Sequence, residues 1–90
     1  MTTRPALVRG PDVAVESREG VVYVSRVPEG PIVVLRDVAA LIWEEAQRSD
    51  PRSIADRVAD RTARTVDEIE EDVAAFVSEL VDGGLLVREG

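Results

Sequence analysis

The side chains of this 90-residue chain that could do chemistry are carboxylates and hydroxyls, because the chain contains neither cysteine nor histidine. Without these residues there is no disulfide, no zinc site of the Cys/His type and no imidazole to act as the base for a hydroxyl nucleophile. An enzyme that used carboxylates alone would need a deep cleft, which the core of so small a domain can hardly enclose. We therefore expect a binding module that is not an enzyme and has no cofactor. The serine and threonine hydroxyls beyond the N-terminal segment are those of Ser17, Ser25, Ser49, Ser53, Ser78, Thr62 and Thr65.

Carboxylates are concentrated in one segment, residues 65–82, which contains no basic residue. Its seven acids are Asp67, Glu68, Glu70, Glu71, Asp72, Glu79 and Asp82. Three of them, Glu68, Glu71 and Asp72, could in principle hold a divalent ion. Acids spaced along one helix rarely converge on an ion, however, and no metal site is predicted.

The overall charge excludes several classes of partner. The chain has 18 acidic and 11 basic residues, all of the latter arginine, for a net charge of −7. This excess argues against nucleic acid and against an anionic membrane. The longest apolar run, residues 38–43, is far shorter than a membrane span, and no secretory signal opens the chain. A cytoplasmic location is expected.

Strand patterns fill the first part of the chain. Val13 and Val15 alternate with small or polar residues, residues 21–27 form a β-branched run, and residues 31–35 form a third apolar segment. The connections are Ser17-Arg18-Glu19-Gly20 and Pro28-Glu29-Gly30, the second suggesting a type I turn followed by a left-handed glycine. The pattern predicts a three-stranded antiparallel meander.

Three helices are expected to follow. Asp37 can cap a helix that runs to about Gln47, and its apolar residues surround it, which indicates a central position. For the second helix, Asp50 is predicted as the cap and Pro51 as the first helical residue. Thr65-Val66-Asp67-Glu68 is a capping box that opens the third helix.

The predicted fold is α+β and winged-helix-like, with the meander followed by the three helices. The third helix ends at Gly83-Gly84, and residues 85–87 form a short final strand or wing. We expect a single domain over residues 12–88, preceded by a flexible N-terminal arm of residues 1–11.

Two features indicate function. The third helix would enter the major groove in a DNA-binding winged helix, yet its seven acids would repel phosphates. Four of these acids are explained by the helix dipole. Asp72 and Glu79 lie beside an apolar stripe, where they could meet a basic group of a partner or simply solvate the helix surface. The third strand, residues 32–35, is an unguarded edge. Either residues 85–87 cover it, or it stays open to receive a strand from a partner.

The succession of these elements resembles the PqqD-like family, the recognition elements of ribosomally made, post-translationally modified peptide (RiPP) pathways. The resemblance covers residues 12–88. Its strings are Gly30-Pro31-Ile32-Val33-Val34-Leu35 leading into Asp37-Val38-Ala39-Ala40-Leu41-Ile42-Trp43-Glu44, the helix at residues 53–62, the helix at residues 66–80, and Gly83-Gly84-Leu85-Leu86-Val87.

This resemblance implies a peptide chaperone that binds the leader of a precursor peptide as a strand added to the third strand. Peptide contacts would come from Ile32, Val33, Val34, Leu35, Ile69, Asp72, Val73, Phe76 and Glu79. The spacing leaves open which side of the third helix faces the leader, and core packing is an equal alternative for Val73 and Phe76. The partner enzyme would be a radical SAM enzyme, a leader protease or another maturase. The alternatives are a DNA-binding regulator and a homodimeric assembly module.

Overall fold

An antiparallel meander forms the first half of the fold. The computed structural model describes residues 7–48 and 52–88. The strands β2 (Val13–Arg18), β3 (Val21–Arg26) and β4 (Ile32–Leu35) lie in the order β2-β3-β4. Glu19 and Gly20 join β2 to β3 with φ angles of 52° and 80°. Two successive positive φ angles match the type I′ turn, whose twist suits a two-residue hairpin. The predicted meander is confirmed.

The second connection differs from its prediction. Gly30 was expected in the left-handed conformation, but its φ is not positive. A Cβ on Gly30 would lie 2.4 Å from the backbone oxygen of Arg26. The Gly30 N–H donates to that same oxygen at 2.6 Å. Glycine is needed here because two backbone segments approach closely.

Three helices follow the meander, as predicted: α1 (Val38–Ala46), α2 (Ile54–Arg61) and α3 (Val66–Asp82). The Thr65 hydroxyl accepts a hydrogen bond from the Glu68 N–H at 3.3 Å, which confirms the cap of α3. The cap of α2 was predicted wrongly. It is Ser53, whose hydroxyl accepts from the Asp56 N–H at 3.1 Å, while Asp50 and Pro51 lie outside the described residues.

Asp37 occupies the N-cap position of α1 but does not cap it with its side chain. Its backbone has φ 51° and ψ −124°, a conformation that non-glycine residues rarely adopt. Asp37 lies in the short connection between the edge strand β4 and α1. The junction is therefore a strained point of the backbone.

A second, two-stranded sheet was not predicted. β1 (Leu7–Arg9) pairs antiparallel with β5 (Leu86–Arg88), with Leu7 opposite Arg88. Residues 7–9 were expected to belong to the N-terminal arm, and residues 1–6 of that arm lie outside the described residues. Because β5 pairs with β1, the final segment does not cover β4.

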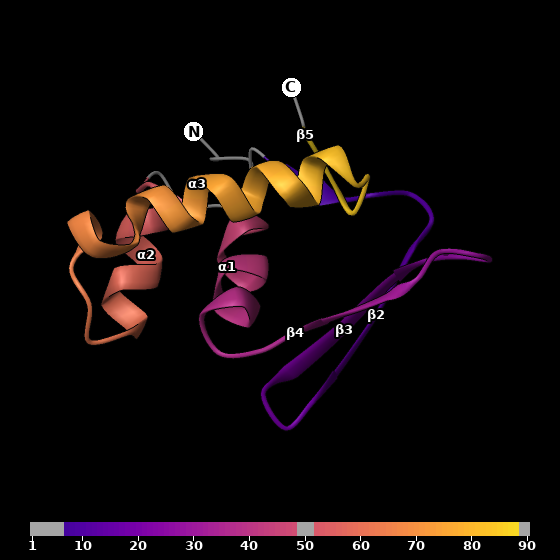
Figure 1. The fold of residues 1–90 in the computed structure, drawn as a ribbon, viewed down its shortest axis with the longest axis horizontal. Coiled ribbons are helices and arrows are strands. Elements are labelled where there is room, and N and C mark those ends of the chain that lie inside the picture. The colour runs from indigo at the N-terminus through magenta and orange to yellow at the C-terminus, as the bar shows by residue number, and fades with distance from the viewer. Residues whose placement is uncertain (1–6, 49–51, 89–90) are drawn as a thin grey trace.

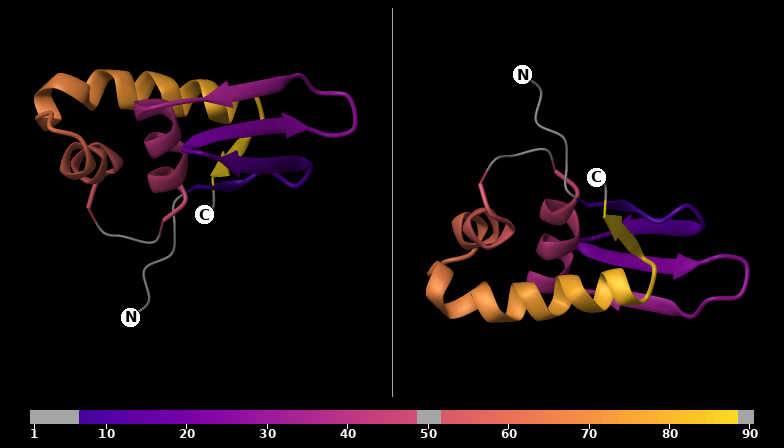
Figure 2. Two further views of the ribbon diagram at one scale, coloured as in Figure 1. Left: turned by 90° about the horizontal axis from the view of Figure 1, so that it is seen from below. Right: turned by 90° about the horizontal axis from the view of Figure 1, so that it is seen from above.

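The helices enclose one face of the meander. Figures 1 and 2 show α1 standing between α2 and the meander, with α3 spanning across them. Trp43 and Ile42 of α1 are buried at the centre, as the apolar surface of that helix predicted. The meander contributes Val22, Val24 and Leu35 to the core, and α3 contributes Ile69, Val73, Val77 and Leu80.

A buried carboxylate joins α1 to α2. Glu45, which is 1% exposed, lies 2.9 Å from Nη1 of Arg61 and 3.2 Å from Nη1 of Arg48. The buried Arg57 donates from Nη1 to the Glu45 backbone oxygen at 2.6 Å, and the same Nη1 lies 3.6 Å from Oε1 of Glu45. Three guanidinium groups thus surround one carboxylate.

Candidate functional site: an open strand edge beside a groove on α3

The hydrogen-bond parity of the meander fixes which backbone groups of β4 point outward. The Val27 N–H donates to the Asp12 oxygen at 2.8 Å, in register with the β2–β3 ladder. Hydrogen-bonded and non-hydrogen-bonded pairs alternate in an antiparallel ladder. Counting from this pair, Tyr23 and Ser25 bond to β2, so Val22 and Val24 of β3 turn their backbone groups toward β4.

The same parity continues into β4. Val22 is opposite Leu35 and Val24 is opposite Val33, so Val33 and Leu35 bond to β3. The backbone groups of Ile32 and Val34 consequently point to the outer edge. No other strand in the described part of the chain pairs with that edge. Two N–H and two C=O groups are left for an added strand.

Beside this edge, two adjoining hollows form a groove along α3. The first has a volume of about 350 Å³ and the second about 290 Å³. Phe76 and Glu79 line both hollows and so join them. The first is completed by Val38, Ala39, Ile42, Arg64, Ile69, Asp72 and Ala75, and the second by Arg26, Pro31, Val33, Leu80, Gly83 and Leu85. We call this surface the α3 groove.

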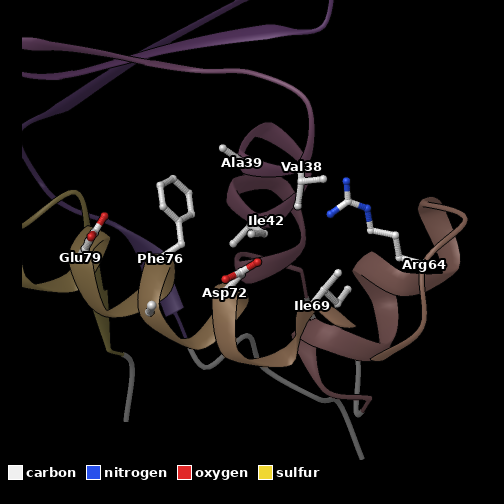
Figure 3. A pocket seen from close by; sticks show the side chains of 9 residues that line it. Val38, Ala39, Ile42, Arg64, Ile69, Asp72, Phe76 and Glu79 are labelled. Carbon is white, nitrogen blue, oxygen red and sulfur yellow. The ribbon is translucent and has the colours of Figure 1, made fainter. Parts of the chain in front are cut away.

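One side of α3 faces the groove. Figure 3 shows Ile69, Asp72, Phe76 and Glu79 projecting from α3 toward the start of α1. Val73, which was also predicted to contact peptide, is 5% exposed, lies in the core and lines neither hollow. Ile69 is shared, because it is buried and also lines the first hollow. The structure thereby distinguishes the two stripes that the sequence left open.

The four predicted residues of β4 alternate between the two faces of the sheet. Val33 is half-buried and lines the second hollow, whereas Leu35 is 2% exposed and belongs to the core. Ile32 and Val34 are 69% and 43% exposed, on the face of the sheet away from the helices. Their contribution to the site is the outward backbone, while Val33 contributes a side chain.

Several groove residues were not predicted. Val38, Ala39 and Ile42 come from α1, whose apolar surface was interpreted as wholly internal. Arg64 precedes α3, and Arg26 ends β3. Arg26, Arg64 and Val38 lie next to a predicted turn or helix start, which is a weak signal, and Ile42 in the middle of α1 has none.

Four charged residues line the groove, Arg26 and Arg64 together with Asp72 and Glu79. Within residues 7–48 and 52–88, none of the four takes part in an ion pair. The arginines of α2 differ, because Arg57 and Arg61 are bound to Glu45. The groove therefore presents both signs of charge without internal neutralisation.

No group of three or more acidic residues in the described ranges is arranged to hold a metal ion. None of the described helices is long and apolar enough to cross a membrane.

The fold and site define a small α+β domain with an open sheet edge beside an apolar groove. The family model of PqqD, described as coenzyme PQQ synthesis protein D, matches residues 18–86. The chain therefore belongs to the PqqD family, as the resemblance in its sequence indicated. Neither a curated protein nor a solved structure gives a significant match. Proteins of this family are non-catalytic accessory proteins that bind a precursor peptide and partner enzymes, which indicates a peptide-binding accessory role in PQQ or RiPP biosynthesis.

Proposed function

We propose that this protein captures the leader segment of a ribosomally made precursor peptide as a fourth strand on β4 and presents the peptide to a separate modifying enzyme. The observation that carries this proposal is the position of the outward backbone groups of Ile32 and Val34 beside the α3 groove, which the neighbouring Val33 lines. An added strand could bond to β4 and place alternate side chains in the groove.

The energetics are sufficient for such binding. The four outward backbone groups can each form a hydrogen bond worth roughly 1 kcal/mol net. Apolar side chains that fill the two hollows add the burial of Phe76 and Val33, which are both half-buried in the unbound protein. After the cost of ordering the leader, an affinity between about micromolar and nanomolar is expected.

The role of the bound leader is delivery. A leader held on β4 keeps the attached core peptide near the partner enzyme, which raises its effective concentration there. A radical SAM enzyme, a leader protease and another maturase all fit this role. The partner enzyme carries out the modification of the peptide. This chain lacks histidine and cysteine, the residues most often used for proton transfer and nucleophilic attack.

The electrostatics disfavour the DNA-binding alternative. A recognition helix in the major groove lies between two rows of phosphates. On α3, Asp67, Glu68, Glu70 and Glu71 are all exposed and would meet those phosphates. A duplex-shift assay at low salt is expected to show no complex.

The test is binding of a fluorescein-labelled leader, synthesised from the precursor peptide encoded beside this chain, to wild type and to Val34→Pro. Proline at position 34 removes an outward N–H and leaves the β3–β4 hydrogen bonds in place, so the fold should persist. We expect the affinity to fall at least tenfold. Unchanged binding to a folded Val34→Pro protein would rule out strand addition.

Val15→Pro is the matched control. By the same parity, the Val15 N–H points to the free side of β2, the opposite edge of the meander. This variant makes the same valine-to-proline exchange on an edge strand and should keep leader affinity.

Light scattering without peptide tests the homodimer alternative. If the molecular mass of wild type doubles as its concentration rises, and that of Val34→Pro does not, β4 pairs with a second copy of the chain.

A further inference from the structure

The charges of the α3 groove follow a definite order along the helix. Arg64 lies just before α3, Asp72 and Glu79 lie on the groove side of α3, and Arg26 lies at the far end. The Arg26 guanidinium packs over Gly84, with Nη1 3.2 Å from the place where a Cβ of that residue would stand. The groove is therefore positive at both ends and negative in the middle.

These charges are available to a ligand. Asp72 and Glu79 are exposed, and the carboxylate of neither forms a hydrogen bond or ion pair with another described residue. In Figure 3 the Asp72 carboxylate points across the groove toward α1, and Arg64 points toward Val38. Phe76, between the two acids, lines both hollows.

We infer, on the basis of the proposed function, that the captured segment carries a basic side chain at its centre, apolar side chains on both sides of it, and a carboxylate at each end. The basic side chain meets Asp72 and Glu79, the apolar ones enter the two hollows, and the carboxylates meet Arg64 and Arg26. A segment of the opposite pattern would place like charges together, which disfavours it.

The dimensions of α3 set the length of this pattern. Asp72 and Glu79 are seven helical residues apart, about 10 Å along the axis, so a basic side chain placed midway lies about 5 Å along the axis from each. The 17 residues of α3 extend about 25 Å. An extended segment of roughly seven or eight residues covers that distance.

The experiment is selection of a phage-displayed library of random nine-residue peptides, flanked by Gly-Ser linkers, on the full chain. Wild type is expected to enrich Lys or Arg at the central positions and apolar residues on both sides. Asp72→Asn/Glu79→Gln should lose the central enrichment and keep the apolar one. Asp72→Lys/Glu79→Lys should select Asp or Glu at the centre.

The matched control is Asp67→Asn/Glu70→Gln, which removes the same two charges from parts of α3 that do not line the groove. It should select the same peptides as wild type. For one selected peptide, each groove charge removed should weaken binding roughly two- to fivefold, and added salt should reduce the difference.

Two outcomes would separate this inference from the proposed function. If wild type and Asp72→Asn/Glu79→Gln select the same peptides, and Val34→Pro loses them, the charge pattern is wrong while strand addition stands. If wild type selects no peptide that Val34→Pro loses, the proposed function fails, and the charge pattern fails with it.

Discussion

Arg61 and Glu45 lie 2.9 Å apart across the interface of α1 and α2, and the Glu45 carboxylate is almost completely buried. Oε1 of Glu45 has no hydrogen-bond partner in the described structure, and its charge is balanced by Arg57 at 3.6 Å. The stability of the α1–α2 contact therefore depends on a desolvated ion cluster, in which the loss of one partner leaves a buried charge.

Glu45→Ala is expected to lower the free energy of unfolding by about 3 kcal/mol, because it leaves the buried Arg57 without its carboxylate. The control is the adjacent Glu44→Ala, which removes an exposed carboxylate 3.0 Å from the same Arg61 and should cost less than about 0.5 kcal/mol. Urea unfolding followed by the fluorescence of Trp43, the single tryptophan, measures both. Equal losses for the two variants would contradict the role of the cluster.

The pH dependence of the stability that this cluster contributes is determined by Arg61. The pKa of Arg61 is raised above its ordinary value, first by its hydrogen bond to Glu45 and then by that to Glu44. A raised pKa contributes stability that is complete below the unfolded value and is lost only as pH rises through the folded value. The difference between wild type and Glu45→Ala should therefore be the same at pH 7 and pH 10.

Asp37→Gly is expected to stabilise the protein by about 1 kcal/mol. Asp37 has φ 51° and makes no capping hydrogen bond, so glycine relieves backbone strain without losing a contact. Arg36→Gly, at an exposed neighbour without a positive φ, should instead destabilise by about 0.5 to 1 kcal/mol. Thermal unfolding measures the two shifts, and a loss of stability in Asp37→Gly would show that the aspartate itself is needed.

Phe76→Ala and Val77→Ala distinguish the contribution of the groove to binding from the contribution of the core to stability. Phe76 is half-buried and lines both hollows, so its removal should weaken leader binding at least tenfold and cost about 1 kcal/mol of stability. Val77 is buried in the core, so its removal should cost about 2 kcal/mol and leave affinity unchanged. Fluorescence anisotropy with the labelled leader and urea unfolding give both quantities. A folded Phe76→Ala protein with full affinity would remove this groove from the binding site.

Local patterns predicted most of the fold. The alternation at Val13 and Val15, the Glu19-Gly20 turn and the Thr65 side-chain cap depend on near neighbours, and all three appear in the structure. β1 was missed because its three residues become a strand only by pairing with β5 at the other end of the chain. The start of α2 was misplaced because Asp50 and Ser53 are both residue types that cap helices well, and the sequence alone does not choose between them.

The site was predicted in part, for a similar reason. The strand edge and the stripe of Ile69, Asp72, Phe76 and Glu79 follow from spacing, and the structure brings that stripe together with Val33. Two helical stripes begin at Ile69, and only the packing of α3 on α1 shows that Val73 belongs to the core. The residues contributed by α1 were missed because a helix buried on most sides gives no sequence signal for the side that stays open.

The pairing of Leu7 with Arg88 has a consequence for protein architecture. It brings the two ends of the described chain side by side in the β1–β5 sheet, while the exposed edge of β4 lies in the other sheet. A domain whose ends meet can be inserted into a surface loop of a larger protein with two short linkers and without strain. This topology would allow the domain to be inserted into different enzymes while its β4 edge stays accessible.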